Sequence, residues 1–77
     1  MIYGFVLITT KAGKEHPVFS ALQDIPEVSD VHPLFGEYDL IARVQGETPE
    51  EIGMIVVEKI RTIDGVTETK TMTSIRF

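Results

Sequence analysis

The 77-residue sequence contains neither cysteine nor tryptophan. Without cysteine the chain can form no disulfide and no thiolate metal site, which fits a reducing compartment. Long apolar segments are also absent. The longest apolar run, Phe5 to Ile8, is too short to cross a bilayer, and no basic segment precedes it as in a signal peptide. We therefore expect a cytoplasmic protein without a membrane anchor.

Basic side chains are scarce: seven Lys and Arg stand against twelve Asp and Glu, giving a formal net charge of −5. The basic residues are scattered along the chain and form no cluster. An acidic surface repels phosphate backbones, so the composition argues against direct binding of nucleic acid.

Signatures of catalysis are missing as well. His16 and His32 fall on different predicted elements and have no third ligand at metal spacing. No serine lies in a Gly-x-Ser-x-Gly context, and no glycine-rich phosphate loop is present. The adjacent acids Glu50 and Glu51 belong to the first turn of a predicted helix, where the helix dipole explains them. We expect no enzyme activity, no cofactor and no bound metal.

The most informative feature present is a repeated motif. Ile25–Val31 (Ile-Pro-Glu-Val-Ser-Asp-Val) recurs as Ile63–Thr69 (Ile-Asp-Gly-Val-Thr-Glu-Thr), an offset of 38 positions (63 − 25). In each copy a helical pattern ends and a strand pattern begins. Two strand–helix–strand units in so short a chain predict an α+β domain of the ferredoxin-like, split βαβ type.

The order of patterns along the chain is β-α-β-β-α-β. We expect an antiparallel four-stranded sheet of order 4-1-3-2 with both helices on one face. Thr48, Pro49 and Glu51 form a strong helix start, and Gly65 suits a left-handed helix stop. The predicted strands cover Ile2–Thr9, Val28–Phe35, Tyr38–Gln45 and Val66–Phe77, and the predicted helices cover Lys14–Ile25 and Pro49–Ile63.

The first strand is apolar on both faces, with Tyr3, Phe5 and Leu7 alternating against Ile2, Val6 and Ile8. Two helices cover one face of a sheet, and the other face would carry further apolar side chains. A patch of several hundred Å² is more than soluble monomers usually expose. We therefore predict a dimer formed by packing sheet against sheet, with about 800 Å² buried per partner. Other contributors expected on this second face are Ile41, Ile75 and Phe77.

A second cluster, Gly36-Glu37-Tyr38-Asp39, lies at the predicted hairpin. One interpretation is an ordinary turn, with glycine for a positive φ and acids for solubility. The other is a ligand site, in which loop N–H groups hold a carboxylate while Asp39 holds an ammonium group. Such a pair of contacts would bind the head group of a free amino acid. The sequence alone leaves both interpretations open.

Three segments together carry a resemblance: Ile25-Pro-Glu-Val28, Gly36-Glu-Tyr-Asp-Leu40 and Lys59-Ile-Arg-x-Ile-x-Gly-Val66 followed by alternating threonines. In this order and spacing the chain resembles the effector (RAM) domain of the Lrp/AsnC, or feast/famine, transcription regulators over Met1–Phe77. Members of that family usually carry an N-terminal helix-turn-helix. Here the first strand begins at Ile2, so we expect one stand-alone RAM-like domain over residues 1–77 without a DNA-binding domain.

The resemblance implies that the domain dimerises through its sheets and forms rings, commonly octamers or decamers. Small effectors, mostly free amino acids, would bind between dimers. Gly36, Tyr38 and Asp39 match the hairpin part of the family's site, with Glu37 among them, and Thr73 and Ser74 correspond by strand spacing to its fourth-strand part. A full-length Lrp/AsnC regulator is one implied partner.

Three alternatives stay open. An ACT-type regulatory domain shares the fold class, and Lys11-Ala12-Gly13 could serve as its glycine-containing loop. A small dimeric barrel enzyme, such as a cofactor-free monooxygenase, also shares the fold but needs a polar cavity, whereas the predicted helix stripes here are aliphatic. A purely structural subunit is the third.

Overall fold

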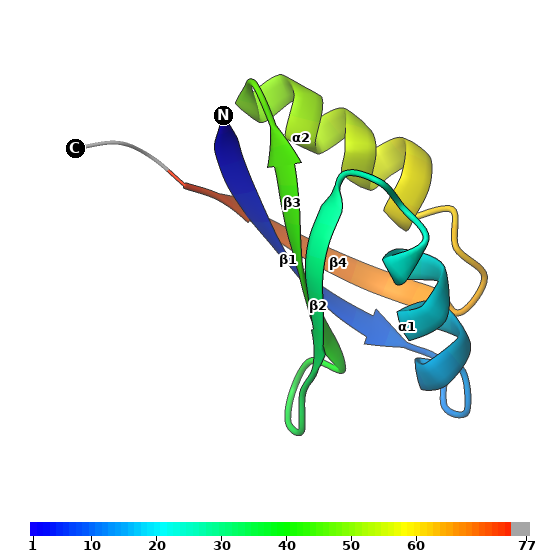
Figure 1. Cartoon of the computed structure of the whole chain (residues 1–77). Coiled ribbons are helices and arrows are strands. Elements are labelled where there is room, and N and C mark those ends of the chain that lie inside the picture. The colour runs from blue at the N-terminus through cyan, green and yellow to red at the C-terminus, as the bar shows by residue number, and fades with distance from the viewer. Residues whose placement is uncertain (75–77) are drawn as a thin grey trace.

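The structure, a computed structural model, describes residues 1–74. Its four strands form one antiparallel sheet of order β2-β3-β1-β4, which is the predicted order 4-1-3-2. Both helices lie on the same side of this sheet (Figure 1). The elements are β1 (Ile2–Thr10), α1 (Glu15–Gln23), β2 (Val28–Pro33), β3 (Leu40–Gly46), α2 (Pro49–Ile55), a π-helical turn η1 (Val56–Ile60) and β4 (Val66–Thr73).

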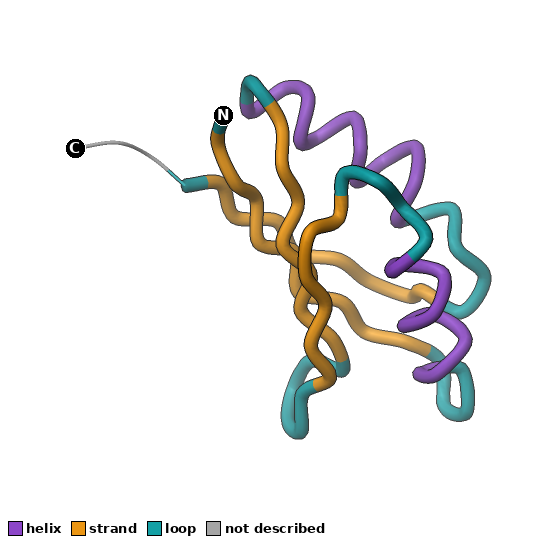
Figure 2. Tube along the Cα trace, in the orientation of Figure 1, coloured by secondary structure: helices purple, strands orange, loops and turns teal. Residues whose placement is uncertain are grey.

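The core lies between the sheet and the helices (Figure 2). Alternate positions of the two central strands point into it, because successive side chains of a strand face opposite sides. Gly4 also faces the helices, and a Cβ atom there would come within 2.5 Å of Ile52 Cγ2. Glycine at this position therefore lets α2 approach β1 closely. The most buried side chains are Val6, Ile8, Val18, Leu22, Leu40, Ala42, Val44, Ile52 and Ile60.

The hairpin between β2 and β3 is longer than predicted. β2 ends at Pro33 rather than Phe35, and β3 begins at Leu40 rather than Tyr38. The predicted tight Gly36-Glu37 connection is therefore wrong, and residues 34–39 form a six-residue loop. Proline has no N–H to continue the ladder, and β2 is an edge strand, as expected for a strand that carries Pro33.

The first helix is also shorter than the predicted range Lys14–Ile25, since it covers Glu15–Gln23. Pro17 lies in its first turn, where the missing N–H leaves no hydrogen bond unmade. The second helix begins as predicted: the Thr48 side chain accepts a hydrogen bond from the Glu51 N–H at 3.1 Å, and Pro49 is the first helical residue.

The last turn of the second helix is π-helical, which the sequence pattern did not predict. The N–H of Arg61 donates to the carbonyl of Val56, five residues back, at 2.8 Å. In a regular α-helix Lys59 would lie four residues beyond Ile55 and would share its buried face. With the wider turn Lys59 is exposed, and Ile60 is completely buried. The chain then turns at Gly65, whose φ of 104° confirms the predicted left-handed stop.

Within residues 1–74, no helix is long and apolar enough to span a membrane.

Candidate functional site

The β2–β3 loop projects from one end of the sheet (Figure 1). Phe35, Gly36 and Glu37 are exposed at its tip, and the Phe35 side chain makes no contact that shields it from solvent. The loop closes through a hydrogen bond from the Leu34 N–H to the Asp39 carbonyl at 2.8 Å. Gly36 has a φ of 157°, positive as the turn interpretation requires but close to the extended region.

Asp39 is the best-anchored residue of this loop. Its N–H donates to the carbonyl of Ile8 at 2.9 Å, and its Oδ2 accepts hydrogen bonds from the N–H of Thr10 at 2.8 Å and from the Thr10 hydroxyl at 3.3 Å. No hydrogen bond within residues 1–74 reaches its other oxygen, Oδ1. One carboxylate oxygen thus holds the side chain in place, while the second can accept a hydrogen bond from a donor outside this chain.

Beside Asp39 lies an open cavity of about 300 Å³ between α1 and the β2–β3 loop, referred to below as the groove. Its surface is mainly apolar and its polar side chains are few. The His16 ring lies 6.4 Å from the ring of Phe19, which forms part of the wall. The apolar lining consists of Phe19, Pro33, Leu34 and Leu40, and the polar lining of Glu15, His16 and Asp39.

The fourth-strand candidates Thr73 and Ser74 lie far from this loop. The Tyr3 N–H donates to Ser74 Oγ at 3.1 Å, and the Ser74 N–H donates to the Tyr3 carbonyl at 2.8 Å. Tyr3 is at the start of β1, whereas Asp39 is bonded to Thr10 at its end. Seven residues of strand at about 3.3 Å each separate the two groups by roughly 23 Å. A single chain therefore does not bring the predicted site residues together.

The sheet face that carries no helix, called the open face below, has an apolar centre. Phe5 and Met72 are opposite one another on β1 and β4, with side chains 37% and 45% exposed, and Leu7 is opposite Ile41 of β3. Sequence analysis placed the first strand and Ile41 on this face but missed Met72. The predicted contributors Ile75 and Phe77 lie outside the described residues.

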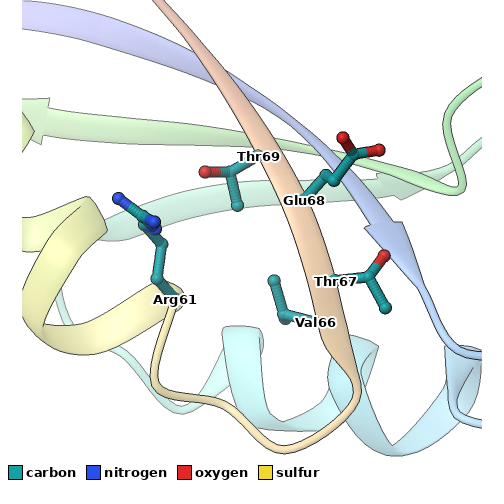
Figure 3. A pocket seen from close by; sticks show the side chains of 5 residues that line it. All are labelled: Arg61, Val66, Thr67, Glu68 and Thr69. Atoms are coloured by element: carbon teal, nitrogen blue, oxygen red, sulfur yellow. The ribbon is translucent and has the colours of Figure 1, made fainter.

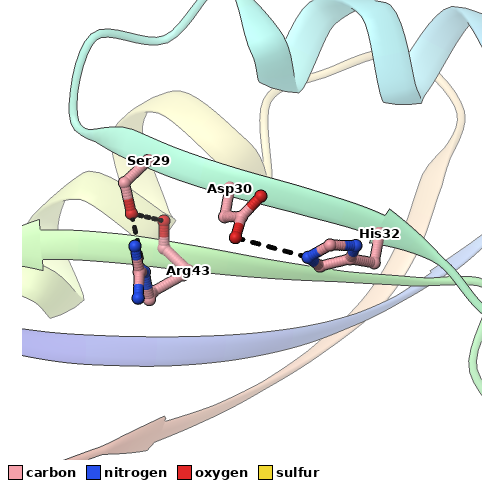
Figure 4. A network of polar contacts seen from close by, with 4 residues as sticks. All are labelled: Ser29, Asp30, His32 and Arg43. Carbon is pink, nitrogen blue, oxygen red and sulfur yellow. Dashed lines mark hydrogen bonds and ion pairs between the residues drawn. The ribbon is translucent and has the colours of Figure 1, made fainter.

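Toward β2 the open face becomes polar, and Figure 4 shows the side chains of Ser29, Asp30, His32 and Arg43 in this region. Arg43 Nε donates to Ser29 Oγ at 3.0 Å, and the Arg43 guanidinium carbon lies 4.9 Å from the centre of the Tyr3 ring. His32 Nε2 lies 3.3 Å from Asp30 Oδ2. An apolar centre with a polar rim is the usual composition of a protein–protein interface.

A second cavity, of about 360 Å³, lies where the helix layer leaves β4 uncovered (Figure 3). In that view Arg61 reaches from the end of η1 toward the side of β4 that bears Val66 and Thr69, while Thr67 and Glu68 point to the other side. The sequence pattern gave no signal for this cavity.

Three comparisons with known proteins complete the description of the site. A family model described as the Lrp/AsnC ligand binding domain matches residues 4–77. An uncharacterized HTH-type transcriptional regulator of Pyrococcus abyssi is 42% identical over 60 residues, covering 78% of this chain and 40% of that protein. The chain thus spans about two fifths of the length of this curated relative.

Solved structures agree with this match. The crystal structure of FFRP-DM1 is similar with a TM-score of 0.91 and 39% sequence identity, covering 97% of this chain and 100% of that one. E. coli AsnC has a TM-score of 0.90 at 21% identity and covers 99% of this chain and 52% of its own, which shows the shared fold.

Proposed function

Because this chain belongs to the family of Lrp/AsnC ligand-binding domains, we propose that it is a cytoplasmic effector-binding and oligomerisation module of transcription regulation. In this proposal it binds a free amino acid, catalyses no reaction and makes no direct contact with DNA. Residues 1–77 act as one RAM-like domain. The ligand contacts are Gly36, Glu37, Tyr38 and Asp39 of one subunit, with Thr73 and Ser74 from another.

The observation that carries the proposal is the position of Asp39. Its Oδ2 is held by Thr10 through two hydrogen bonds, and its Oδ1 remains available beside the groove. A carboxylate fixed in this way accepts an ammonium group without first losing side-chain freedom, which lowers the entropic cost of binding. The N–H groups of the exposed loop at Gly36 and Glu37 supply donors for the ligand's carboxylate.

The distance between the hairpin and Thr73 supports a shared site between subunits. A ligand that contacts both groups must lie where the loop end of one sheet meets the opposite end of another. Binding of such a ligand depends on assembly, and assembly depends on binding, because the two equilibria are thermodynamically linked.

The open face supports the dimer. Phe5, Leu7, Ile41 and Met72 form a contiguous apolar patch on a small domain that has no disulfide to stabilise it. Packing two such faces together would remove this apolar surface from water, and a stable dimer typically buries about 800 Å² per partner. Both helices then face outward, and further contacts between dimers build the proposed octameric or decameric ring. A full-length Lrp/AsnC regulator is the proposed heterologous partner.

A thermal-shift screen against the twenty amino acids, with light scattering on each sample, tests the proposal. We expect one amino acid, or a chemically related group, to raise the melting temperature and to change the assembly mass. A stabilisation of about 2.7 kcal/mol accompanies a ligand present at a hundred times its Kd, which corresponds to a rise in melting temperature of roughly 10–20 °C for a domain of this size. If none of the twenty changes either quantity at millimolar concentration, an amino acid is not the effector.

A further inference from the structure

We infer that the groove beside Asp39 takes the side chain of the bound amino acid and that it selects ligands with an uncharged, apolar side chain. This inference rests on the proposed function, since it requires an amino acid whose ammonium group lies at Asp39. It goes beyond that proposal by naming the part of the chain that distinguishes one amino acid from another.

The groove is built from three separate parts of the fold. Phe19 comes from α1, Leu34 from the loop and Leu40 from the start of β3, and together they form an apolar surface next to the carboxylate. Leu40 is almost completely buried beneath, while the Leu34 side chain is 41% exposed and is free to be covered further. A volume of about 300 Å³ lies at the lower end of the range for small-molecule sites. The groove is therefore sized for a small ligand.

The position of Asp39 relative to this surface sets the orientation of the ligand. Oδ2 is turned toward Thr10 at the end of β1, so the carboxylate is fixed at one border of the groove. An amino acid whose ammonium group bonds to Oδ1 has its side chain directed along the apolar wall. The head group is thus recognised by charge and the side chain by burial of apolar area.

The charges around the groove exclude acidic ligands. Glu15 and Asp39 are the acidic side chains in its lining, neither Lys nor Arg lines it within the described residues, and the chain as a whole is acidic. The side chain of an acidic amino acid carries a second carboxylate. In the groove this carboxylate would be repelled by the two acids and would lose its hydration against Phe19 and Leu34. A basic side chain would also lose hydration on the apolar wall, and the exposed carboxylate of Glu15 offsets little of that cost, because attraction between solvent-exposed charges is weak.

A matched ligand series tests this selection by calorimetry and thermal shift. Leucine and aspartate are nearly isosteric, and norleucine and lysine differ mainly in the terminal ammonium group. We expect leucine and norleucine to bind, and aspartate and lysine to bind at least about tenfold more weakly. Alanine, which lacks most of the leucine side chain, should also bind at least about tenfold more weakly than leucine. The des-amino analogue 4-methylpentanoate should not bind, because it offers Asp39 no donor.

A pair of variants locates the selection in the groove. Leu34→Gln places an amide in its wall, whereas Met54→Gln makes the same kind of change at an exposed apolar side chain on α2, outside the groove. Leu34 is in a loop and partly exposed, so neither change removes a core contact. We expect Leu34→Gln to weaken leucine binding about tenfold relative to alanine binding and Met54→Gln to leave both unchanged. Circular dichroism verifies that both variants are folded.

The outcomes separate the two proposals. Equal binding of leucine and lysine, or leucine binding that is indifferent to Leu34→Gln, overturns the apolar selection while amino-acid binding itself stands. Absence of binding by every amino acid overturns both. Binding of 4-methylpentanoate as tightly as leucine removes the role of Asp39 and with it the orientation on which the inference depends.

Discussion

The carboxylate of Asp39 accepts a hydrogen bond from the backbone N–H of Thr10 at 2.8 Å, which ties the β2–β3 loop to the end of β1. Sequence reasoning left two interpretations of Asp39 open, a solubilising acid of an ordinary turn or a ligand-binding residue. The structure adds a second role, because Thr10 is part-buried and would otherwise lack this acceptor. Substitutions at Asp39 must be interpreted with both roles in view.

Asp39→Ala should destabilise the protein by about 1–3 kcal/mol, because it removes a charged acceptor that bonds both the N–H and the hydroxyl of the part-buried Thr10. Asp39→Asn retains an oxygen for Thr10 and should cost less. For ligand binding, however, Asn removes the negative charge that holds the ammonium group, so both variants should lose ligand-induced stabilisation. Urea denaturation with and without amino acid measures both quantities. Equal stability of Asp39→Ala and wild type would contradict the structural role.

Phe5→Glu should convert the proposed dimer to a monomer. Phe5 lies at the centre of the open face, and a carboxylate there cannot be buried against a second sheet without a large desolvation cost. Size-exclusion chromatography with light scattering should give the single-chain mass of 8.6 kDa for this variant. Val57→Glu, at an exposed apolar position of η1, is the control and should keep the wild-type mass. A Phe5→Glu protein that remains dimeric would exclude the open face as the interface.

Thr48→Ala should lower the stability by about 1 kcal/mol, because the Glu51 N–H loses the side-chain oxygen that it bonds at 3.1 Å. Thr48→Ser keeps a hydroxyl at the same position and should retain most of that stability. Thermal or urea unfolding of the two variants side by side isolates the cap. Identical losses in both would mean that the methyl group rather than the hydrogen bond matters.

Gly65→Ala should be more harmful than Gly36→Ala. At Gly65, with φ of 104°, an added Cβ would come within 2.8 Å of Lys14 Cβ and 3.0 Å of Val18 Cγ2. At Gly36 nothing lies within 4 Å of the added atom. We expect a loss of about 1–3 kcal/mol at Gly65, from backbone strain together with the clash, and a smaller loss at Gly36. The reverse order in urea denaturation would contradict this geometry.

The ion pair between Glu27 and Lys59 should contribute to acid sensitivity. Lys59 Nζ lies 2.7 Å and 2.9 Å from the two carboxylate oxygens, and these hydrogen bonds lower the pKa of Glu27 in the folded protein. A lowered folded-state pKa means that the contribution is complete above the ordinary glutamate value of about 4.3 and is lost as the pH falls through the lowered pKa.

Glu27→Gln should therefore flatten the dependence of stability on pH below about pH 5 and leave its slope near pH 7 unchanged. Urea denaturation of wild type and variant at a series of pH values measures the difference. If the free energies of unfolding of the two proteins differ by the same amount at every pH, the charge of Glu27 contributes nothing to the pH dependence of stability.

The local signals in the sequence were sufficient for the order of elements and the topology. The repeated Ile-to-Val turn motif, the cap at Thr48 and the stop at Gly65 all act through neighbouring residues, and the structure has each of them where the pattern predicted. Alternation along the first strand likewise separated Val6 and Ile8, which are buried, from Phe5, which is not.

Element ends and helix type depended on contacts between distant residues. β3 begins at Leu40, and the preceding Asp39 is held by Ile8 and Thr10 of β1, contacts between distant residues that no local preference of Tyr38 reveals. At the π turn Lys59 lies outside the core, where it pairs with Glu27, while Ile60 is buried.

The candidate site likewise has some features that follow from the sequence and others that depend on contacts between distant residues. The sequence by itself determined which groups can recognise an amino acid head group, since side-chain carboxylates and backbone N–H groups of a loop have that chemistry in any fold. The tertiary structure alone decided that Asp39 has one oxygen fixed by Thr10, that an apolar groove lies beside it, and that Ser74 is at the far end of the sheet. Chemistry belongs to single residues, but distance and burial are set by the packing of segments that are remote in the chain.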